Sequence, residues 1–346
     1  MKRGETINGY TVLVEPTTSG GGRCVWSFAE RGSRQYFIKQ FLDPKWPTEE
    51  SMGSPASKVM RRKACQEFEN RQNEVNGLIN GKAVGGGNLV TMTDFFRVGT
   101  TYYKVTERIA AEVANDLTGF TDRQTVVVLR TLAMSLRLMH RAGIVHGDLK
   151  PANVLLQQSS AAHLYTAKVI DFDDSYLAGM PPPPDQIVGD QQYGAPEWLR
   201  YVKQDPGVEA EHLTAAADIF ALGLMTHVYL MGELPGYDRG RFGAPCEAVL
   251  AGEPLVLSEE LDQRTRQMIA RMVSADIAAR PTIDEVILLL QDEQVVRVGH
   301  ADPAAEPAGD TRRLRARPSV GDTRPIPASP PRPAAHGSRV RFNFDR

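Results

Sequence analysis

The chain has 346 residues and a formal net charge of −2 at pH 7, and 42% of its residues are hydrophobic. This length allows one large domain or two modest ones with buried cores. The near-neutral charge gives no reason to expect nucleic acid as the main partner. No run approaches the roughly 18 apolar residues that a membrane span needs, and none follows Met1–Glu5 as a signal peptide would require. We therefore expect a cytoplasmic protein with no membrane contact, whose three widely spaced cysteines stay reduced.

The first part of the chain is rich in β-forming residues. Three runs, 10–14, 24–29 and 36–41, combine aromatic and β-branched residues and are separated by glycine or turn residues, which predicts strands. The loop before the second run contains the consecutive glycines Gly20, Gly21 and Gly22.

A long polar segment follows, from Lys58 to Asn80. It lacks proline and spaces its apolar residues at roughly helical intervals, which predicts a helix. These apolar residues are Met60, Ala64, Phe68, Val75 and Leu78. Two more β-prone runs, 89–92 and 102–105, lie on either side of a Gly99-Thr100 turn, as in a hairpin. The pattern predicts an N-terminal lobe of about five strands and one helix.

Beyond Arg108 the pattern becomes helical. Thr121 and Asp122 can cap a helix that runs to Arg141. Further helices are expected over 215–231, 259–273 and 283–291. The chain as a whole is therefore of the α+β class, with a small β-rich part followed by a larger helical part.

The composition changes sharply near residue 300. From Ala301 onward there are nine Arg and five acidic residues, and eight of the last 46 residues are proline. So few apolar groups cannot offset the entropy of ordering the chain, which predicts a disordered tail over 300–346. Within it Gly309–Arg312 recurs as Gly321–Arg324. The repeat indicates either phosphorylation sites or a low-complexity linker.

The strongest chemical signal is His146–Leu155, with the sequence HGDLKPANVL, followed later by Asp171. Phosphoryl transfer from ATP needs a carboxylate to orient the acceptor hydroxyl and oxygen ligands for metal ions on the phosphates. Asp148 suits the first role, and Asn153 and Asp171 suit the second, because Mg²⁺ prefers carboxylate and amide oxygens. Lys150 lies two residues beyond Asp148, within reach of the transferring phosphoryl oxygens.

This segment resembles the catalytic loop and metal-binding motif of eukaryotic-type, or Hanks-type, serine/threonine protein kinases. Taken alone, it also resembles the shorter HGD motif of small-molecule kinases such as aminoglycoside kinases. Ala195–Glu197 and Asp218 favour the protein kinases. The first resembles the Ala-Pro-Glu that closes the activation segment, and the second resembles the aspartate that braces the catalytic loop. Arg280 resembles the arginine that pairs with Glu197.

The resemblance covers about residues 8–295 and implies a bilobal protein-kinase-like fold. The N-lobe would span about 8–107 and the C-lobe about 110–295. Lys39 stands where the third-strand lysine of kinases holds the α- and β-phosphates. Its carboxylate partner should come from the helix over 58–80. We expect Glu74 to be that partner, and Glu67 and Glu69 remain open.

The resemblance also implies the residues that bind the base. Val25 and Leu155 would cover the two faces of adenine. Thr106 would be the gatekeeper at the back of the pocket, and Glu107 to Ile109 would offer backbone groups to the adenine edge. In the glycine loop only Gly20 aligns with the family pattern, while Gly21 and Gly22 still allow close approach to phosphates.

Three positions depart from the family pattern. Phe37 replaces a small alanine above the adenine, and Asp173 replaces the glycine of the metal-binding motif. Gly147 replaces the arginine that usually reads a phosphate on the activation segment. Because Asp190 could pair directly with Lys150 instead, we expect activity without phosphorylation of that segment.

We therefore expect a serine/threonine kinase that uses ATP with Mg²⁺, or Mn²⁺ in its place, on a protein substrate. Lys150 in the catalytic loop favours Ser or Thr over Tyr as the acceptor. The alternative is a weakly active, pseudokinase-like scaffold or adaptor, motivated by Phe37 and Asp173. The motifs look more bacterial than eukaryotic, so a phosphatase, an adaptor or a phosphothreonine-binding protein is an expected partner through the tail.

Overall fold

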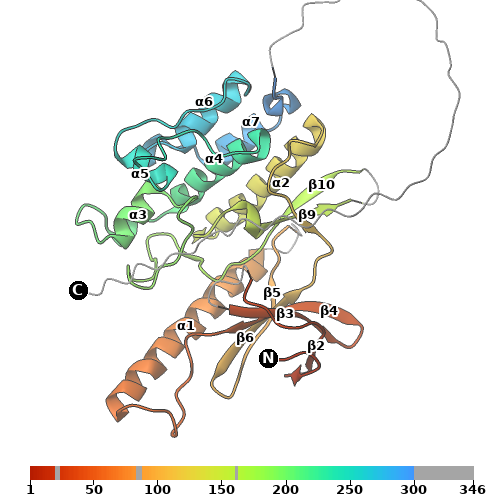
Figure 1. Cartoon of the computed structure of the whole chain (residues 1–346), viewed down its shortest axis with the longest axis vertical. Helices are drawn as coiled ribbons and strands as arrows, with labels where there is room; N and C mark the ends of the chain where they lie inside the picture. Colours follow the sequence, from red (N-terminus) through yellow and green to blue (C-terminus); the bar gives the residue numbers. More distant parts are fainter. Residues whose placement is uncertain (20–23, 83–87, 160–162, 300–346) are drawn as a thin grey trace, which may run out of the picture.

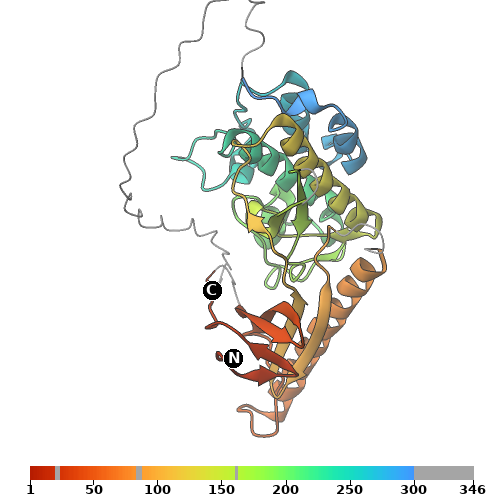
Figure 2. The same ribbon diagram turned by 90° about the vertical axis from the view of Figure 1, so that its right-hand side faces the viewer.

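The computed structural model describes residues 1–19, 24–82, 88–159 and 163–299. They form two lobes: a sheet with one long helix, and a larger helical lobe (Figures 1 and 2). None of the described helices combines the length and apolarity needed to cross a bilayer. The predicted tail over 300–346 lies outside the described residues, and the domain limits 8–295 stay a prediction.

The N-terminal lobe contains a six-stranded antiparallel sheet with the order β1-β2-β3-β4-β6-β5. Its strands are β1 (Thr6–Ile7), β2 (Tyr10–Val12), β3 (Cys24–Arg31), β4 (Arg34–Phe41), β5 (Met92–Val98) and β6 (Thr101–Glu107). The predicted strand over 89–92 is wrong in its position, because β5 begins only at Met92. Leu89 and Val90 instead contact Val169 of the other lobe through a bridge and a backbone hydrogen bond.

Successive side chains of these strands point to opposite faces of the sheet, and this places the apolar residues in two separate groups. Ile38 lies on one face among Val12, Ala29 and Val105. Phe41 lies on the other face with Cys24, against Cys65 and Phe68 of the long helix. Lys39 shares the Phe41 face, because residues two apart in a strand point to the same side.

The long helix is α1 (Pro55–Lys82), and it runs along the sheet toward the junction of the lobes (Figure 1). Its buried face follows helical spacing at Cys65, Phe68, Gln72, Val75 and Ile79. The predicted face was therefore partly wrong: the side chains of Met60 and Ala64 are exposed. Counting apolar residues missed the true face because it includes buried polar groups.

The C-terminal lobe is mainly helical. Its α-helices are α2 (Asp122–Arg141), α3 (Pro196–Val202), α4 (Ala215–Met231), α5 (Pro245–Leu250), α6 (Gln263–Met272) and α7 (Ile283–Leu289). The predicted start of α2 is confirmed, since Thr121 and Gln124 form a reciprocal capping box. The bounds of α4 also match, and Gly232 ends it in a left-handed conformation.

Short strands connect these helices to the junction of the lobes. They are β7 (Glu112–Val113), β8 (Ile144–Val145), β9 (Val154–Gln158), β10 (Tyr165–Val169) and β11 (Tyr176–Leu177). The order β10-β9-β7 forms one small sheet, and β8 pairs with β11. The loop between β8 and β9 carries the segment with the strongest chemical signal, so both of its ends are fixed by strand pairing.

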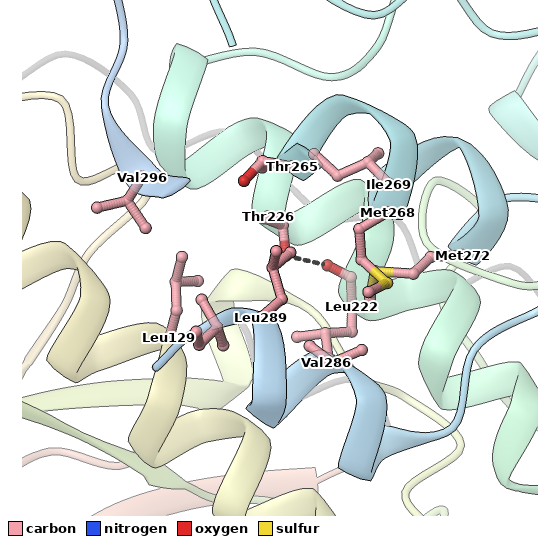
Figure 3. A pocket seen from close by; sticks show the side chains of 11 residues that line it. Leu129, Leu222, Thr226, Thr265, Met268, Ile269, Met272, Val286, Leu289 and Val296 are labelled. Atoms are coloured by element: carbon pink, nitrogen blue, oxygen red, sulfur yellow. Dashed lines mark hydrogen bonds between the residues drawn. The ribbon is translucent and has the colours of Figure 1, made fainter. Parts of the chain in front are cut away.

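A small apolar cavity of about 20 Å³ lies between α2, α4, α6 and α7 (Figure 3). The side chains of Leu129, Leu222 and Met272 are among those that line it. This volume is close to that of one water molecule, so we interpret the cavity as a packing gap in the core and not as a ligand site.

Candidate active site

The loop between β8 and β9 brings three of the predicted site residues together. Lys150 Nζ donates to Asp148 Oδ1 at 3.0 Å. Asn153 Nδ2 donates to the Asp148 backbone oxygen at 2.7 Å and to Oδ2 at 3.0 Å. All three residues are buried, Asp148 at 2% exposure. The loop therefore holds one carboxylate in a fixed orientation, as charge-assisted hydrogen bonds in a buried site do.

Asp218, from the first turn of α4, holds the start of this loop. Its carboxylate accepts from the backbone N–H groups of His146 at 2.8 Å and Gly147 at 3.2 Å, and it also bonds His140 Nε2 at 3.0 Å. The predicted bracing of the loop by Asp218 is confirmed. Gly147 has φ +78°, and a Cβ there would lie 2.7 Å from the Asp174 carbonyl oxygen. Glycine is therefore the residue that fits this backbone.

The Ile170 N–H donates to the Asn153 backbone oxygen at 3.0 Å, so the segment that continues with Asp171 lies beside this loop. Lys39 contacts that segment from the other lobe. Its Nζ lies 2.7 Å from Asp171 Oδ1 and 2.8 Å from Asp173 Oδ2. Burial alone would lower the pKa of Lys39, but the charges of Asp171 and Asp173 more than offset this effect, so the pKa is raised. Lys39 thus stays a cation close to a predicted metal ligand.

The predicted pairing of Lys39 with Glu74 is wrong in this structure. Glu74 is exposed on α1, because it falls outside the buried face of that helix. The two alternatives are also occupied elsewhere: Glu69 accepts from the hydroxyl of Tyr102 at 2.5 Å, and Glu67 pairs with Lys63 at 3.8 Å.

The segment between Asp171 and Glu197 is held by polar contacts at several points. Asp190 Oδ2 accepts from Lys150 Nζ at 3.1 Å, so the predicted direct pair is confirmed. At the far end, the Arg280 guanidinium makes two bonds to Glu197, of 2.6 and 2.8 Å, as the sequence predicts. Both members of this last pair are buried. The end of the segment is thus fixed to the helical lobe.

The predicted metal ligands fit a magnesium ion in their chemistry. The bonds from Asn153 to Asp148 use its amide nitrogen, which leaves its amide oxygen as the donor atom for a cation. Asp171 contributes a carboxylate. Among the residues that the structure describes, no three His, Cys, Asp or Glu side chains form a metal cage. Mg²⁺ needs none, since proteins commonly bind it through one or two side chains and the substrate's phosphates.

The comparisons with known proteins agree with this geometry. The family model of the protein kinase domain matches residues 48–289. The chain belongs to the protein kinase family.

Individual relatives of this kinase are distant. Serine/threonine-protein kinase PknA of Mycobacterium tuberculosis is 28% identical over 259 residues, which cover 70% of this chain and 56% of the relative. A probable myosin light chain kinase of Dictyostelium discoideum is 29% identical over 161 residues, 45% of this chain and 49% of the relative. The chain therefore spans about half the length of these two relatives. The solved kinase PK-1 of Cydia pomonella granulovirus shares the fold, with a TM-score of 0.53 at 19% identity over 81% of this chain and 93% of that one.

The face of the sheet that carries Lys39 differs from the prediction. In the register of β3 with β4, Trp26 lies opposite Lys39 and Phe28 lies opposite Phe37. Directly opposite residues share a face, so Trp26 lies on the Lys39 face and Val25 lies on the other. The predicted adenine contact of Val25 is therefore wrong. The ring centroids of Trp26 and Phe37 are 5.2 Å apart, so aromatic rings form part of this face.

The segment predicted to form the hinge lies at the end of β6 and just beyond it. Thr106 and Glu107 end that strand, and Ile109 is half-buried beyond it. The Arg108 backbone N–H donates to the Gln35 oxygen at 3.1 Å, which ties the hinge to β4. An open depression borders the hinge, and its lining includes Phe28, Arg34, Glu107 and Ile109.

The other predicted nucleotide contacts are Leu155 and the glycine loop. Leu155 is half-buried on β9, between Lys168 of β10 and Val113 of β7 in the sheet register. The glycine loop, with Gly20, Gly21 and Gly22, lies outside the described residues.

The sequence interpretation missed Lys104 and Gln72. Lys104 is 5% exposed and lies 2.8 Å from Asp173 Oδ1. Gln72 is 2% exposed on α1. A lysine inside a β-prone run usually points to solvent. The burial of Lys104 could therefore be suspected from the sequence only together with the unusual Asp173, a possible anionic partner.

Proposed function

We propose that the chain transfers the γ-phosphoryl group of ATP to serine or threonine of a protein substrate. The observation that carries the proposal is the buried group of Asp148, Lys150 and Asn153, held beside a segment whose Asp171 contacts Lys39. Phosphoryl transfer depends mainly on positioning and on charge stabilisation, and this group supplies both.

Each residue has a separate role in the proposed reaction. Asp148 orients the acceptor hydroxyl and accepts its proton. Lys150 places a cation beside the transferring phosphoryl oxygens. Lys39 holds the α- and β-phosphates, and Asn153 and Asp171 hold the metal. When bound, Mg²⁺ neutralises charge on the phosphate oxygens.

The acceptor preference rests on the catalytic loop and on the relatives. The order Asp148, Lys150, Asn153 resembles that of serine/threonine kinases. PknA and the Schizosaccharomyces pombe relative ppk6, 28% identical over 213 residues, are named serine/threonine-protein kinases. Nucleotide contacts at Thr106, Glu107, Ile109 and Leu155 belong to the same proposal.

We also propose that activity does not require a phosphate on the activation segment. Lys150 already has Asp190 as an anionic partner at 3.1 Å. Ser175 is 1% exposed and donates from its hydroxyl to the His146 backbone oxygen at 3.0 Å, and Tyr176 is 2% exposed. Side chains this deeply buried are poor acceptors for another kinase. A phosphatase, an adaptor or a phosphothreonine-binding protein as partner of residues 300–346 stays a prediction.

The direct test is phosphate incorporation into a generic basic protein from Mg-ATP. Asp148→Asn keeps the shape of the side chain but removes the proton acceptor, so we expect turnover to fall by about 10³-fold while nucleotide binding persists. Asp122 is a half-buried aspartate at the start of α2 that pairs with Arg297, so Asp122→Asn is the matched control and should retain full activity. Wild-type protein that binds Mg-ATP but transfers nothing would overturn the proposal and favour a scaffold.

A further inference from the structure

Two buried lysines lie side by side in the sheet above the cleft. In the register of β4 with β6, Lys39 is directly opposite Lys104. The two residues are 9% and 5% exposed. Like charges directly opposite each other destabilise a sheet, and burial increases the cost because water no longer screens them. This pair therefore needs a compensating anion close to both ammonium groups.

Asp173 is placed where it meets this need. Its Oδ2 lies 2.8 Å from Lys39 Nζ, and its Oδ1 lies 2.8 Å from Lys104 Nζ. The Asp173 side chain is itself only 9% exposed. One carboxylate thus bridges the two lysines with one oxygen each.

The helix takes part through an amide. Gln72 Oε1 lies 3.4 Å from Lys104 Nζ, and Gln72 Nε2 lies 3.5 Å from the Asp173 backbone oxygen. Asn76, one turn later on the same buried face, donates to the Gln72 backbone oxygen at 2.6 Å. Through Gln72, α1 meets the lysine pair with a neutral side chain, while Glu74 is exposed. Arg71, the residue before Gln72, is a half-buried cation that interacts with the charges of Asp174 and Asp173.

We propose that Asp173 is the positioning residue that holds Lys39 for the phosphates, and that Lys104 and Gln72 couple it to α1. In most protein kinases a glutamate of this helix holds the lysine. Here the carboxylate has moved to the position after Phe172, and the helix supplies an amide in its place. The inference rests on the phosphate role proposed for Lys39.

The charges in the cluster support this assignment. Lys39 contacts Asp171 and Asp173, and Lys104 contacts Asp173. A further cation, Arg71 of α1, interacts with the charges of Asp174 and Asp173. Asp171 is also the proposed metal ligand, so its negative charge is shared with the cation when nucleotide is bound. Asp173 is then the carboxylate that keeps Lys39 in place.

The test measures binding of a non-hydrolysable Mg-ATP analogue by calorimetry, which needs no phosphate transfer. We expect Asp173→Asn to weaken binding by about 10- to 100-fold, the size expected for losing a charge-assisted hydrogen bond to a buried cation. Hydrogen exchange along residues 65–79 of α1 should increase as well, because Lys104, which contacts Gln72 of this helix, loses its anionic partner. Asp94 lies on the same sheet and pairs with Arg31. Asp94→Asn is therefore the matched control and should leave both readouts unchanged.

Because Asp173→Asn leaves two buried lysines without their shared anion, it could unfold the lobe. The double variant Asp173→Asn, Lys104→Met removes the uncompensated charge, so it should recover thermal stability but still bind the analogue weakly. Adding Gln72→Glu to Asp173→Asn returns a carboxylate from the helix side and should recover at least tenfold of the lost affinity.

Three results separate the possible outcomes. Asp173→Asn binding the analogue as tightly as wild type, with unchanged exchange in α1, would overturn the inference. Loss of binding in Glu74→Gln would overturn it too, because the helix carboxylate would then hold Lys39. Wild-type protein that binds the analogue and responds to Asp173→Asn as expected, yet transfers no phosphate, would refute the proposed function and leave this inference standing.

Discussion

The two sides of the cleft differ in how closely they keep the protein kinase arrangement. On the helical side, Asp218 braces the catalytic loop as the family pattern predicts, and Asn153 contacts Asp148 within that loop. On the sheet side, the lysine has an unexpected partner in Asp173, and Trp26 lies on the face where Val25 was expected. The groups proposed for phosphoryl transfer are present on both sides, but only the helical side keeps the supports that the family pattern predicts.

This difference shows which parts of the site tolerate change. The catalytic loop is a short segment whose contacts depend on residues close in sequence and on one brace from α4. The support of Lys39 needs only a buried carboxylate within about 3 Å, and any neighbouring element can supply it.

The strongest support on the helical side is the Glu197–Arg280 pair. Arg280→Met would leave the Glu197 carboxylate buried without its cation, since both residues are at most 6% exposed. We expect the free energy of unfolding to fall by about 3–5 kcal/mol. Urea unfolding measures it, with Arg271→Met as the control, because the Arg271–Glu285 pair is exposed and should contribute less than about 1 kcal/mol. Equal losses in the two variants would contradict this account of the segment's anchor.

The brace under the catalytic loop should act on rate more than on binding. Asp218→Asn replaces one of two acceptor oxygens with an amide N–H that faces a backbone donor. The loop would shift, and we expect kcat to fall about 100-fold with little change in KM for ATP. Steady-state kinetics at matched thermal stability measures this, and a rise in KM with kcat unchanged would show that Asp218 supports nucleotide binding instead.

The activation segment should work without phosphate. The triple variant Ser175→Ala, Tyr176→Phe, Tyr193→Phe removes the hydroxyl groups between Asp174 and Glu197. We expect turnover within about threefold of wild type, because Asp190 already supplies the anion next to Lys150. Loss of most activity in a variant that remains folded would show that a phosphate is required.

The smallest effect concerns pH. His227 accepts from the Ser258 N–H at Nε2, and its Nδ1 lies 2.8 Å from the Glu233 oxygen, which fits a neutral ring. Burial lowers its pKa below the ordinary 6.5. The unfolded chain therefore binds the proton first, and this contribution to stability is complete above about pH 6.5 and is lost as pH falls toward the lower folded pKa. Thermal unfolding at pH 7 and pH 5 should differ less in His227→Gln than in wild type, and an equal difference would contradict the assignment.

Much of the helical lobe could be predicted from sequence because its signals are local. The start of α2 follows from Thr121 and its capping box, and the end of α4 follows from Gly232. The residues of the catalytic loop are likewise close in sequence, so their spacing alone brings Asp148, Lys150 and Asn153 together.

The sheet side could not be predicted in the same way, because its contacts join distant segments. The choice of Glu74 assumed that the helix face toward the cleft carries a carboxylate, but that face carries Gln72. The buried face of α1 includes the polar residues Gln72 and Asn76, so the spacing of apolar residues did not reveal the orientation of the helix. Nothing in the sequence of β6 indicated that Lys104 is buried. Only the register of β4 with β6 reveals that Lys104 faces Lys39.

Phosphate mapping by mass spectrometry tests whether this chain transfers phosphate to serine and threonine. The full chain is incubated with Mg-ATP and a generic basic protein, beside Asp148→Asn as the inactive reference. We expect phosphates on serine and threonine only, in the added protein or in the chain's own Thr311, Ser319 or Thr323, and we expect them to be lost in Asp148→Asn. Phosphotyrosine, or equal incorporation in the two proteins, would contradict this expectation.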